Sequence, residues 1–269
     1  MLVLDTVSYR YAGAAGDAVT KISLDLRDQE VVGLVGANES GKSTVCLVAS
    51  GLAPRAIGGV LGGRVLIDGA DVAGRPIHEL VGTVGICFQN PETQLSGVTE
   101  TVFEEVAFGP ANLGIDRDEL VRRTGEALET LGIQGLARRD PRRLSGGQMQ
   151  LVALAGLLAL QPRYLVLDEP TAQLDPAGTR LVGEALQALA QRGSAILIAE
   201  HKTDLLAGLC GRIAVLQRGE LAMLGGAQEV LADDRLEGLG IAAPVQGRLQ
   251  RRIDALGLAA TSIAPEPGR

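Results

Sequence analysis

Residues 36–44 are Gly36-Ala37-Asn38-Glu39-Ser40-Gly41-Lys42-Ser43-Thr44, and they directly follow the apolar run Val31–Val35. The stretch fits the phosphate-binding pattern G-x-x-x-x-G-K-[ST], in the strand-then-helix context that this chemistry needs. Backbone amides freed by the glycines surround a polyphosphate, and the next helix starts with its positive end toward those anions. Lys42 adds a positive charge for the outer phosphates, and Ser43 offers a hydroxyl to Mg²⁺. We therefore predict a nucleotide site that contains Gly36, Asn38, Ser40, Gly41, Lys42, Ser43 and Thr44.

The composition limits the kinds of protein that this chain can be. Of its 269 residues 46% are hydrophobic and 2% aromatic, so we expect a substantial core of Leu, Val, Ile and Ala. The net charge is −7 and no long basic run occurs, which disfavours a nucleic-acid partner held by a basic surface. Only three of the 25 basic residues are lysines (Lys21, Lys42 and Lys202), so composition alone does not explain the lysine of the loop.

The cysteines and the apolar runs bear on the compartment. Cys46, Cys87 and Cys210 lack the spacing of metal ligands and lie in or beside apolar segments, so we predict buried free thiols in a reducing compartment. The N-terminus has no signal-peptide pattern. The longest apolar run, Leu151–Leu160, is too short to span a bilayer. We therefore expect a chain that is soluble on its own.

The order of the segments predicts an α/β fold. Apolar runs indicate strands near residues 2–4, 22–26, 31–35, 65–67, 84–88, 164–167 and 195–199. Helical patterns prevail from about 90 to 162, where Asp116 is the expected N-cap of a helix. That helix is expected to share one face among Leu120, Val121, Thr124, Leu128 and Leu131. We predict a P-loop (RecA-like) core with a parallel sheet, an N-terminal antiparallel β subdomain and a helical insert.

Two carboxylates, Asp168 and Glu169, end the apolar strand Leu165–Leu167. In P-loop proteins this strand lies beside the phosphate loop, so Asp168 can hold Mg²⁺ through water. Glu169 is then placed to polarise the attacking water. Alone this is a weak signal, because acidic turns often follow buried strands. Its combination with Lys42 and Ser43 favours the functional interpretation.

A third motif, Leu144-Ser145-Gly146-Gly147-Gln148, opens a helix, with Ser145 as its N-cap and two glycines freeing amides at the positive end. An ordinary capped helix start is the simpler interpretation. Lying downstream of a phosphate loop and some twenty residues before the Asp-Glu strand, however, the motif resembles the signature of ABC ATPases. The resemblance covers residues 1 to about 225. It implies an ATPase domain at 1–225, with a helical subdomain at about 90–162, and a C-terminal extension at 226–269 that is partly helical and frays at 264–269.

The resemblance also implies roles for isolated residues. Tyr11 matches the aromatic that stacks on adenine, although a plain strand aromatic is the alternative. Gln89 stands where the Q-loop glutamine contacts Mg²⁺ and the attacking water. His201 matches the switch histidine that contacts the γ-phosphate. Gln173-Leu174-Asp175 matches the D-loop, and Asp175 also serves as a helix cap.

Two positions depart from the family pattern. Glu39 stands where the phosphate loop usually has a small residue, commonly glycine, and a carboxylate there repels polyphosphate unless it points outward or binds a cation. Leu151 replaces the usual arginine after the signature. Neither change removes a group that performs chemistry, but both put the turnover rate in question.

The resemblance implies a shared site. In this family the signature residues Ser145, Gly146, Gly147 and Gln148 would complete the ATP site of a second ABC ATPase subunit, the same or a homologous chain, in a head-to-tail dimer. Residues 88–114 further resemble the ATPases of energy-coupling-factor (ECF) transporters, which import vitamins and transition-metal ions such as cobalt and nickel. The implied protein hydrolyses ATP with Mg²⁺, on the cytoplasmic side of the membrane, bound peripherally to separate transmembrane subunits.

Two alternatives stay open at this point. The first is a soluble ABC ATPase with a function other than transport, such as cluster assembly. The second is a subunit that binds ATP without hydrolysing it, given Glu39 and Leu151. We predict a competent site, because all of the expected chemical groups are present: Lys42, Ser43, Gln89, Asp168, Glu169 and His201.

Overall fold

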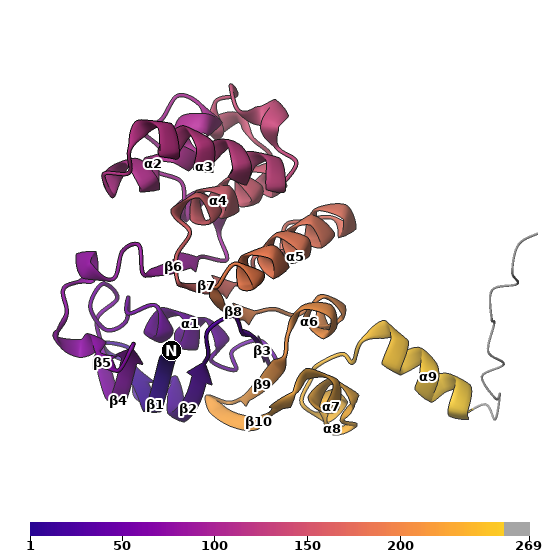
Figure 1. Cartoon of the computed structure of the whole chain (residues 1–269). Helices are drawn as coiled ribbons and strands as arrows, with labels where there is room; N and C mark the ends of the chain where they lie inside the picture. The colour runs from indigo at the N-terminus through magenta and orange to yellow at the C-terminus, as the bar shows by residue number, and fades with distance from the viewer. Residues whose placement is uncertain (256–269) are drawn as a thin grey trace, which may run out of the picture.

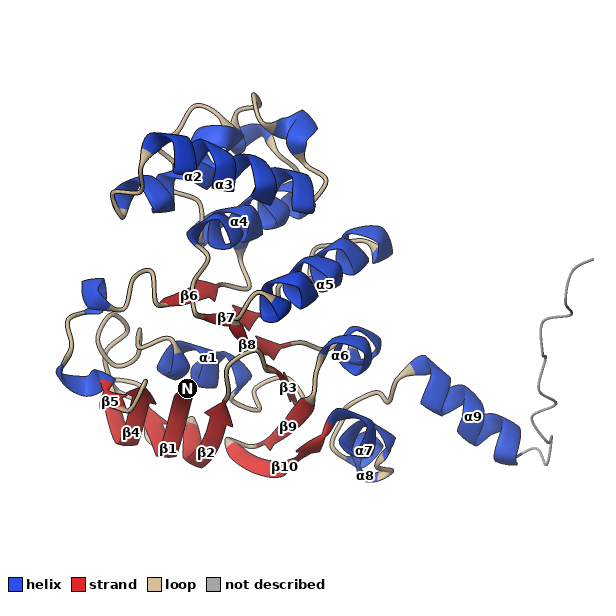
Figure 2. Ribbon diagram, viewed as in Figure 1, coloured by secondary structure: helices blue, strands red, loops and turns tan. Residues whose placement is uncertain are grey.

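The structure, a computed structural model, describes residues 1–255 and combines two β-sheets with two groups of helices (Figures 1 and 2). The tail predicted to fray, residues 264–269, lies outside the described residues. The mixed α/β class predicted from the sequence is confirmed, including the antiparallel N-terminal sheet and the helical insert.

The central sheet has six strands in the order β10-β9-β3-β8-β7-β6. Neighbours from β9 to β6 run parallel, and β10 is an antiparallel edge strand. The strands are β3 (Val31–Val35), β6 (Val84–Cys87), β7 (Tyr164–Asp168), β8 (Ala195–Ala199), β9 (Arg212–Gln217) and β10 (Glu220–Gly226). Because parallel strands end at the same edge, the segments that follow β3, β6, β7 and β8 meet there. Strands β9 and β10 were not predicted from the sequence.

The smaller sheet is antiparallel, in the order β2-β1-β4-β5. Its strands are β1 (Leu2–Arg10), β2 (Val19–Leu26), β4 (Val60–Ile67) and β5 (Ala70–Asp71). They are longer than the predicted runs, because polar residues alternate with the buried ones on the exposed face. Helix α1 (Lys42–Ala49) packs between the two sheets, as Figure 2 shows.

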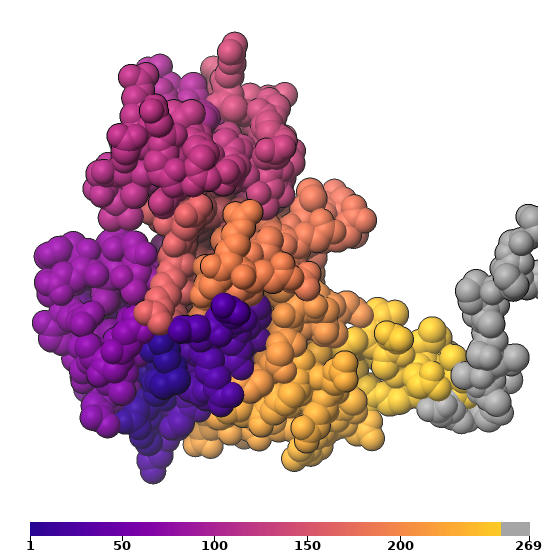
Figure 3. All heavy atoms as spheres, viewed as in Figure 1, coloured from indigo at the N-terminus to yellow at the C-terminus, as the bar shows by residue number. Residues whose placement is uncertain are grey.

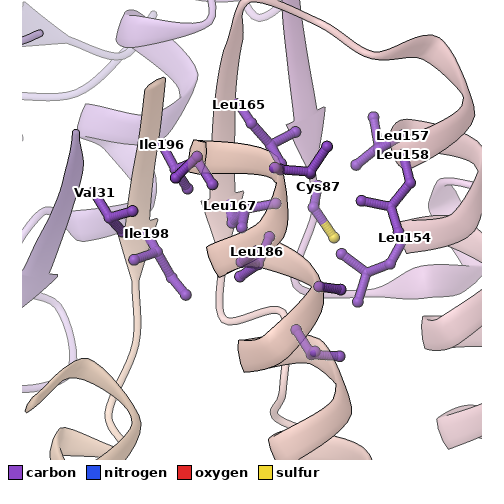
Figure 4. Close-up of a cluster of buried hydrophobic side chains, with 14 of the residues drawn as sticks. Val31, Cys87, Leu154, Leu157, Leu158, Leu165, Leu167, Leu186, Ile196 and Ile198 are labelled. Atoms are coloured by element: carbon purple, nitrogen blue, oxygen red, sulfur yellow. The ribbon is translucent and has the colours of Figure 1, made fainter. Parts of the chain in front are cut away.

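Each face of the central sheet belongs to a different core, because successive strand residues point to opposite sides. Val32 and Leu34 pack toward α1 and the small sheet, whereas Val31 and Val35 belong to the second cluster. Figure 4 shows this second cluster, in which Leu154 of α4 and Leu186 of α5 lie against the strands. The sheet and α1 thereby form a rigid base under the phosphate loop.

The helical insert stands above the sheet as a distinct lobe (Figure 3). It contains α2 (Val102–Asn112), α3 (Arg117–Thr130) and α4 (Gly146–Leu160). Asp116 caps α3 as predicted, accepting a hydrogen bond from the backbone N–H of Asp118 at 2.9 Å. The predicted placement of Val121 on the buried face is wrong: its exposed fraction is 48%, because burial of α3 begins only at Thr124.

The remaining helices of the described chain come after β7 in the sequence. They are α5 (Pro176–Gln191), α6 (Thr203–Leu209), α7 (Ala227–Ala232), α8 (Arg235–Gly238) and α9 (Val245–Ala255), the last of which projects from the body (Figure 1). Short 3-10 turns occur at Val72–Gly74, Ile77–Glu79, Pro91–Thr93, Gln134–Leu136 and Pro141–Arg143. Within residues 1–255 no helix has the length and apolar character to cross a membrane. The three cysteines are buried and free, as predicted.

Candidate functional site

The phosphate loop connects β3 to α1, and its glycines are required by space. A Cβ atom on Gly36 would lie 2.3 Å from the Ser40 Oγ and 2.6 Å from the backbone oxygen of Leu216. Gly41 has a φ of 104°, in the region that favours glycine. The loop therefore turns tightly enough to direct its backbone amides toward a single anion.

Lys42 closes the loop from inside. Its Nζ donates hydrogen bonds to the carbonyl oxygens of Gly36 at 3.0 Å and Ala37 at 3.1 Å. Burial lowers the pKa of the Lys42 ammonium, while the nearby carboxylates of Glu169 and Asp168 raise it. The ammonium is thus held beside the loop amides, where it can neutralise phosphate charge.

A cavity of about 510 Å³ opens over the loop, a volume typical of small-ligand sites. Its lining is Ala18, Asn38, Glu39, Ser40, Gly41, Lys42, Ser43, Thr44, Gln89, Glu169 and His201. Three larger cavities, of about 520, 600 and 730 Å³, contain no residue of the phosphate loop, although the largest shares His201. The predicted nucleotide site corresponds to the smallest of these four cavities, which alone among them combines the phosphate loop with Lys42 and Glu169.

Asp168 lies at the base of this site and fits the expected metal ion. It ends β7 with an exposed fraction of 8%, with the Ser43 hydroxyl nearby. Burial raises the pKa of the Asp168 carboxyl. Its Oδ1 is buried without a hydrogen-bond partner, which is costly unless a cation or donor satisfies it. A carboxylate oxygen, a hydroxyl and nucleotide phosphates are the hard oxygen ligands that Mg²⁺ prefers.

Two predicted residues from separate segments, Gln89 and His201, contact the carboxylate of a third, Glu169. The Gln89 Nε2 donates to the Glu169 Oε2 at 2.9 Å, and the His201 Nε2 lies 3.0 Å from the Glu169 Oε1. Glu169 has a φ of 50° and its backbone N–H donates to the Ala199 oxygen at 2.8 Å, which ties it to β8. Glu169 is thereby held between the ends of β6 and β8. The catalytic roles of the three residues stay predictions.

Tyr11 lies just beyond β1, beside the start of α1. Its hydroxyl is 3.1 Å from the Thr44 Oγ1, and its ring makes an edge contact with Tyr9 at a centroid distance of 5.0 Å. The structure places Tyr11 next to the phosphate loop, although it does not line the cavity. Its role in adenine stacking stays a prediction.

The two departures from the family pattern have different surroundings. Glu39 is exposed at the rim of the cavity with a φ of 62°, a conformation that explains why glycine is common at this position. Leu151 is half-buried and packs against the main core, so an apolar contact replaces the usual charge.

The signature loop is shaped by the D-loop of its own subunit. Ser145 and Gln148 form a reciprocal cap, with the Gln148 N–H donating to the Ser145 Oγ at 3.3 Å and the Ser145 N–H donating to the Gln148 Oε1 at 3.1 Å. A Cβ on Gly146 would lie 2.1 Å from the Gln173 Oε1, and one on Gly147 would lie 3.1 Å from the Gln173 oxygen. Residues 145–148 thus contact the D-loop, and none of them lines the phosphate-loop cavity.

Comparison with known proteins agrees with this geometry. Residues 19–172 match a family model described as ABC transporter. The energy-coupling factor transporter ATP-binding protein EcfA2 of Symbiobacterium thermophilum is 38% identical over 98% of this chain and 91% of its own length. CbiO1 of Clostridium perfringens, described as part of the CbiONQ ABC transporter complex, is 30% identical with a TM-score of 0.75, covering 93% of this chain and 98% of its own. A dimeric ATP-binding cassette in a post-hydrolysis state with ADP and Pi is 25% identical with a TM-score of 0.74, covering 84% of this chain and 99% of its own.

The chain therefore belongs to the ABC transporter ATP-binding family. It is an ATP-binding subunit of an ABC transporter and an ATP hydrolase, and its relatives include ATPases of energy-coupling-factor transporters. Of the similar structures, one is dimeric and another is part of an ABC transporter complex.

Sequence reasoning missed several residues around the site. Ala18 lines the cavity, and Glu200, Thr171 and Lys202 form a hydrogen-bonded group behind His201. Lys202 carried a signal in the sequence as one of just three lysines, and Glu200 carried one because Ala199-Glu200-His201 resembles the switch region of ECF ATPases.

Proposed function

We propose that this chain drives the uptake of a vitamin or a transition-metal ion through separate membrane subunits, from the cytoplasmic side of the membrane. The named ECF and CbiO1 relatives support an importer. In this proposal residues 1–225 form the ATPase unit, and residues 226–269 are an extension of it.

In this proposal the membrane subunit docks on the segment between β6 and α2, which hydrogen bonds hold at both ends. Gln94 accepts from the backbone N–H of Phe88 at 3.1 Å and donates to the Ile86 oxygen at 3.0 Å. At the other end, the buried Glu105 accepts from the Ser96 N–H at 2.6 Å and the Ser96 hydroxyl at 2.7 Å. A displacement of this segment by the membrane subunit would therefore move Gln89, which directly follows Phe88.

The observation that carries the catalytic proposal is the separation of two halves of a site. The phosphate loop, Gln89, Glu169 and His201 share one cavity, whereas Ser145–Gln148 lie on the D-loop of the same subunit. A second subunit, the same or a homologous chain, would bring its Ser145, Gly146 and Gly147 to this cavity in a head-to-tail dimer. The capped N-terminus of α4 would then direct amides and the positive helix end at the phosphates.

In this mechanism the loop amides and Lys42 bind the phosphates of ATP. Ser43, Asp168 and Gln89 would hold Mg²⁺, which supplies charge neutralisation when bound. Gln89 and His201 orient the Glu169 carboxylate so that it can accept a proton from the attacking water. Most of the catalysis then comes from positioning and charge stabilisation.

The substitution Glu169→Gln tests the site. The amide keeps the size of the side chain but is a very poor base, so we expect ATP to bind while turnover falls by about 10²–10⁴-fold, the usual contribution of a general base. Bound ATP then persists, and light scattering after size exclusion should show a dimer mass that depends on ATP. Wild-type turnover in this variant, or no ATP-dependent dimer, would contradict the assigned role of Glu169.

Co-purification tests the transport role. Native chain isolated from a mild detergent extract should carry at least one multi-span membrane protein. Isolation only within a soluble assembly complex would overturn the importer proposal while leaving the ATPase mechanism intact.

A further inference from the structure

Lys202, which follows His201 and precedes α6, directs its ammonium group at the D-loop segment. Its Nζ donates to the Thr171 oxygen at 2.7 Å, the Thr179 Oγ1 at 2.8 Å and the Leu174 oxygen at 3.3 Å. A lysine ammonium has three donors, so these three acceptors use its full capacity. The side chain therefore joins the segment after β8 to Leu174 of the D-loop and to Thr171 and Thr179 on either side of it.

Glu200, on the other side of His201, binds the same segment. Its side chain is buried, with an exposed fraction of 2% for the residue. One carboxylate oxygen accepts from the Thr171 hydroxyl, and the other accepts from the backbone N–H groups of His201 at 2.8 Å and Lys202 at 3.3 Å. Thr171 is thus held twice, by its hydroxyl through Glu200 and by its carbonyl through Lys202.

The segment held in this way connects two functional surfaces. At one end His201 contacts Glu169, at 3.0 Å between the Nε2 and Oε1. At the other end Gln173 packs against Gly146 and Gly147, where a Cβ atom would lie 2.1 Å from its Oε1 and 3.1 Å from its backbone oxygen. Glu200 and Lys202 occupy neither surface. Their hydrogen bonds hold Thr171 and so fix the position of the segment that lies between the two surfaces.

We propose that Lys202 and Glu200 are positioning residues that lock the D-loop to the switch histidine. The lock would set the geometry of His201 and Glu169 in one ATP site together with that of the signature loop offered to the other site. This inference rests on the proposed head-to-tail dimer. Both residues use charge-assisted hydrogen bonds, three donated by Lys202 and three accepted by Glu200.

The test compares three variants of the full-length chain. Lys202→Met removes the ammonium but keeps an unbranched stem, and Lys202→Arg restores donors. Lys21→Met removes the same charge from an exposed site on β2 and serves as the matched control. We expect Lys202→Met to lower kcat about tenfold, the order expected for losing a charged hydrogen bond, with KM for ATP little changed. Lys202→Arg should recover part of kcat, and Lys21→Met should match the wild type.

A second measurement separates this inference from the proposed function. In the Glu169→Gln background, adding Lys202→Met should weaken ATP-dependent dimerisation about tenfold. No ATP-dependent dimer with Glu169→Gln alone would refute the proposed function itself. Equal dimerisation with and without Lys202→Met, together with wild-type kcat in the single variant, would overturn the lock.

A milder variant covers the case in which Lys202→Met does not fold. Thr179→Val removes one acceptor and preserves the shape of the side chain, so we expect a drop in kcat of about two- to fivefold, with KM unchanged. If Thr179→Val turns over at the wild-type rate, the lock is overturned.

Discussion

Glu39 offers the sharpest test of how the phosphate loop of this chain differs from its family. Its carboxylate is exposed at the rim of the ATP cavity, and its backbone has a φ of 62°. Glu39→Gln removes the charge and keeps a non-glycine residue in the left-handed backbone conformation. Glu39→Gly removes both. The pair of variants therefore separates electrostatic repulsion from conformational strain.

The two effects have different sizes. One unit charge acting on another across about 8 Å of water contributes about 0.5 kcal/mol, and physiological salt reduces this by about half. Summed over the several charges of a triphosphate, repulsion by Glu39 is worth about 1 kcal/mol, so Glu39→Gln should bind ATP about fivefold more tightly. The left-handed backbone costs a non-glycine residue about 1–2 kcal/mol, while glycine loses about 0.5–1 kcal/mol through its freer unfolded chain. Glu39→Gly should therefore raise the free energy of unfolding by at most about 1.5 kcal/mol.

Calorimetric titration with ATP at low and high salt measures the first effect, and denaturant unfolding measures the second. The gain in affinity should shrink at high salt, because the group is exposed. Glu129→Gln, an exposed glutamate on α3, is the matched control and should leave Kd unchanged. An ATP Kd for Glu39→Gln within twofold of the wild type at low salt would refute the repulsion. If the assembled transporter released no phosphate and Glu39→Gly restored release, the predicted competence of the native site would be wrong.

Two further predictions follow from burial and close packing. Gly36→Ala should abolish ATP binding, since its Cβ would lie 2.6 Å from a backbone oxygen. Gly125→Ala on α3, with open space around it, should instead add about 1 kcal/mol to the free energy of unfolding. ATP titration and denaturant unfolding check both, and equal ATP binding by the two variants would contradict the packing argument. Burial raises the pKa of Cys87 and of Cys210 from 9.0 to about 12, so the folded state keeps these protons longer than the unfolded state does. This stabilisation is fully present below pH 9 and is lost as the pH rises toward 12. Thiol labelling at pH 8 should accordingly be slow until denaturant is added, and rapid labelling of the native chain would contradict the burial.

Much of the site could be predicted because its chemistry lies in short contiguous motifs. The phosphate loop needs glycines, a lysine and a hydroxyl in consecutive positions, and Asp168 and Glu169 directly end a buried strand. The lengths of the strands were harder to predict, because β1 and β4 carry polar residues on an exposed face and β10 is an edge strand. Val121 fits the helical period of α3 but lies before the part of the helix that is buried.

The sequence by itself determined the class of protein, the phosphate loop and the residues predicted to act on phosphate, because these follow from local spacing and side-chain chemistry. Only the tertiary structure decided that Gln89, Glu169 and His201 meet at one carboxylate, and that the signature loop packs on the D-loop rather than on its own cavity. It also decided the left-handed backbone of Glu39 and the three contacts of Lys202. The physical reason is that local sequence encodes the period and ends of each element, whereas the parallel register of β3, β8 and β7 brings those ends together.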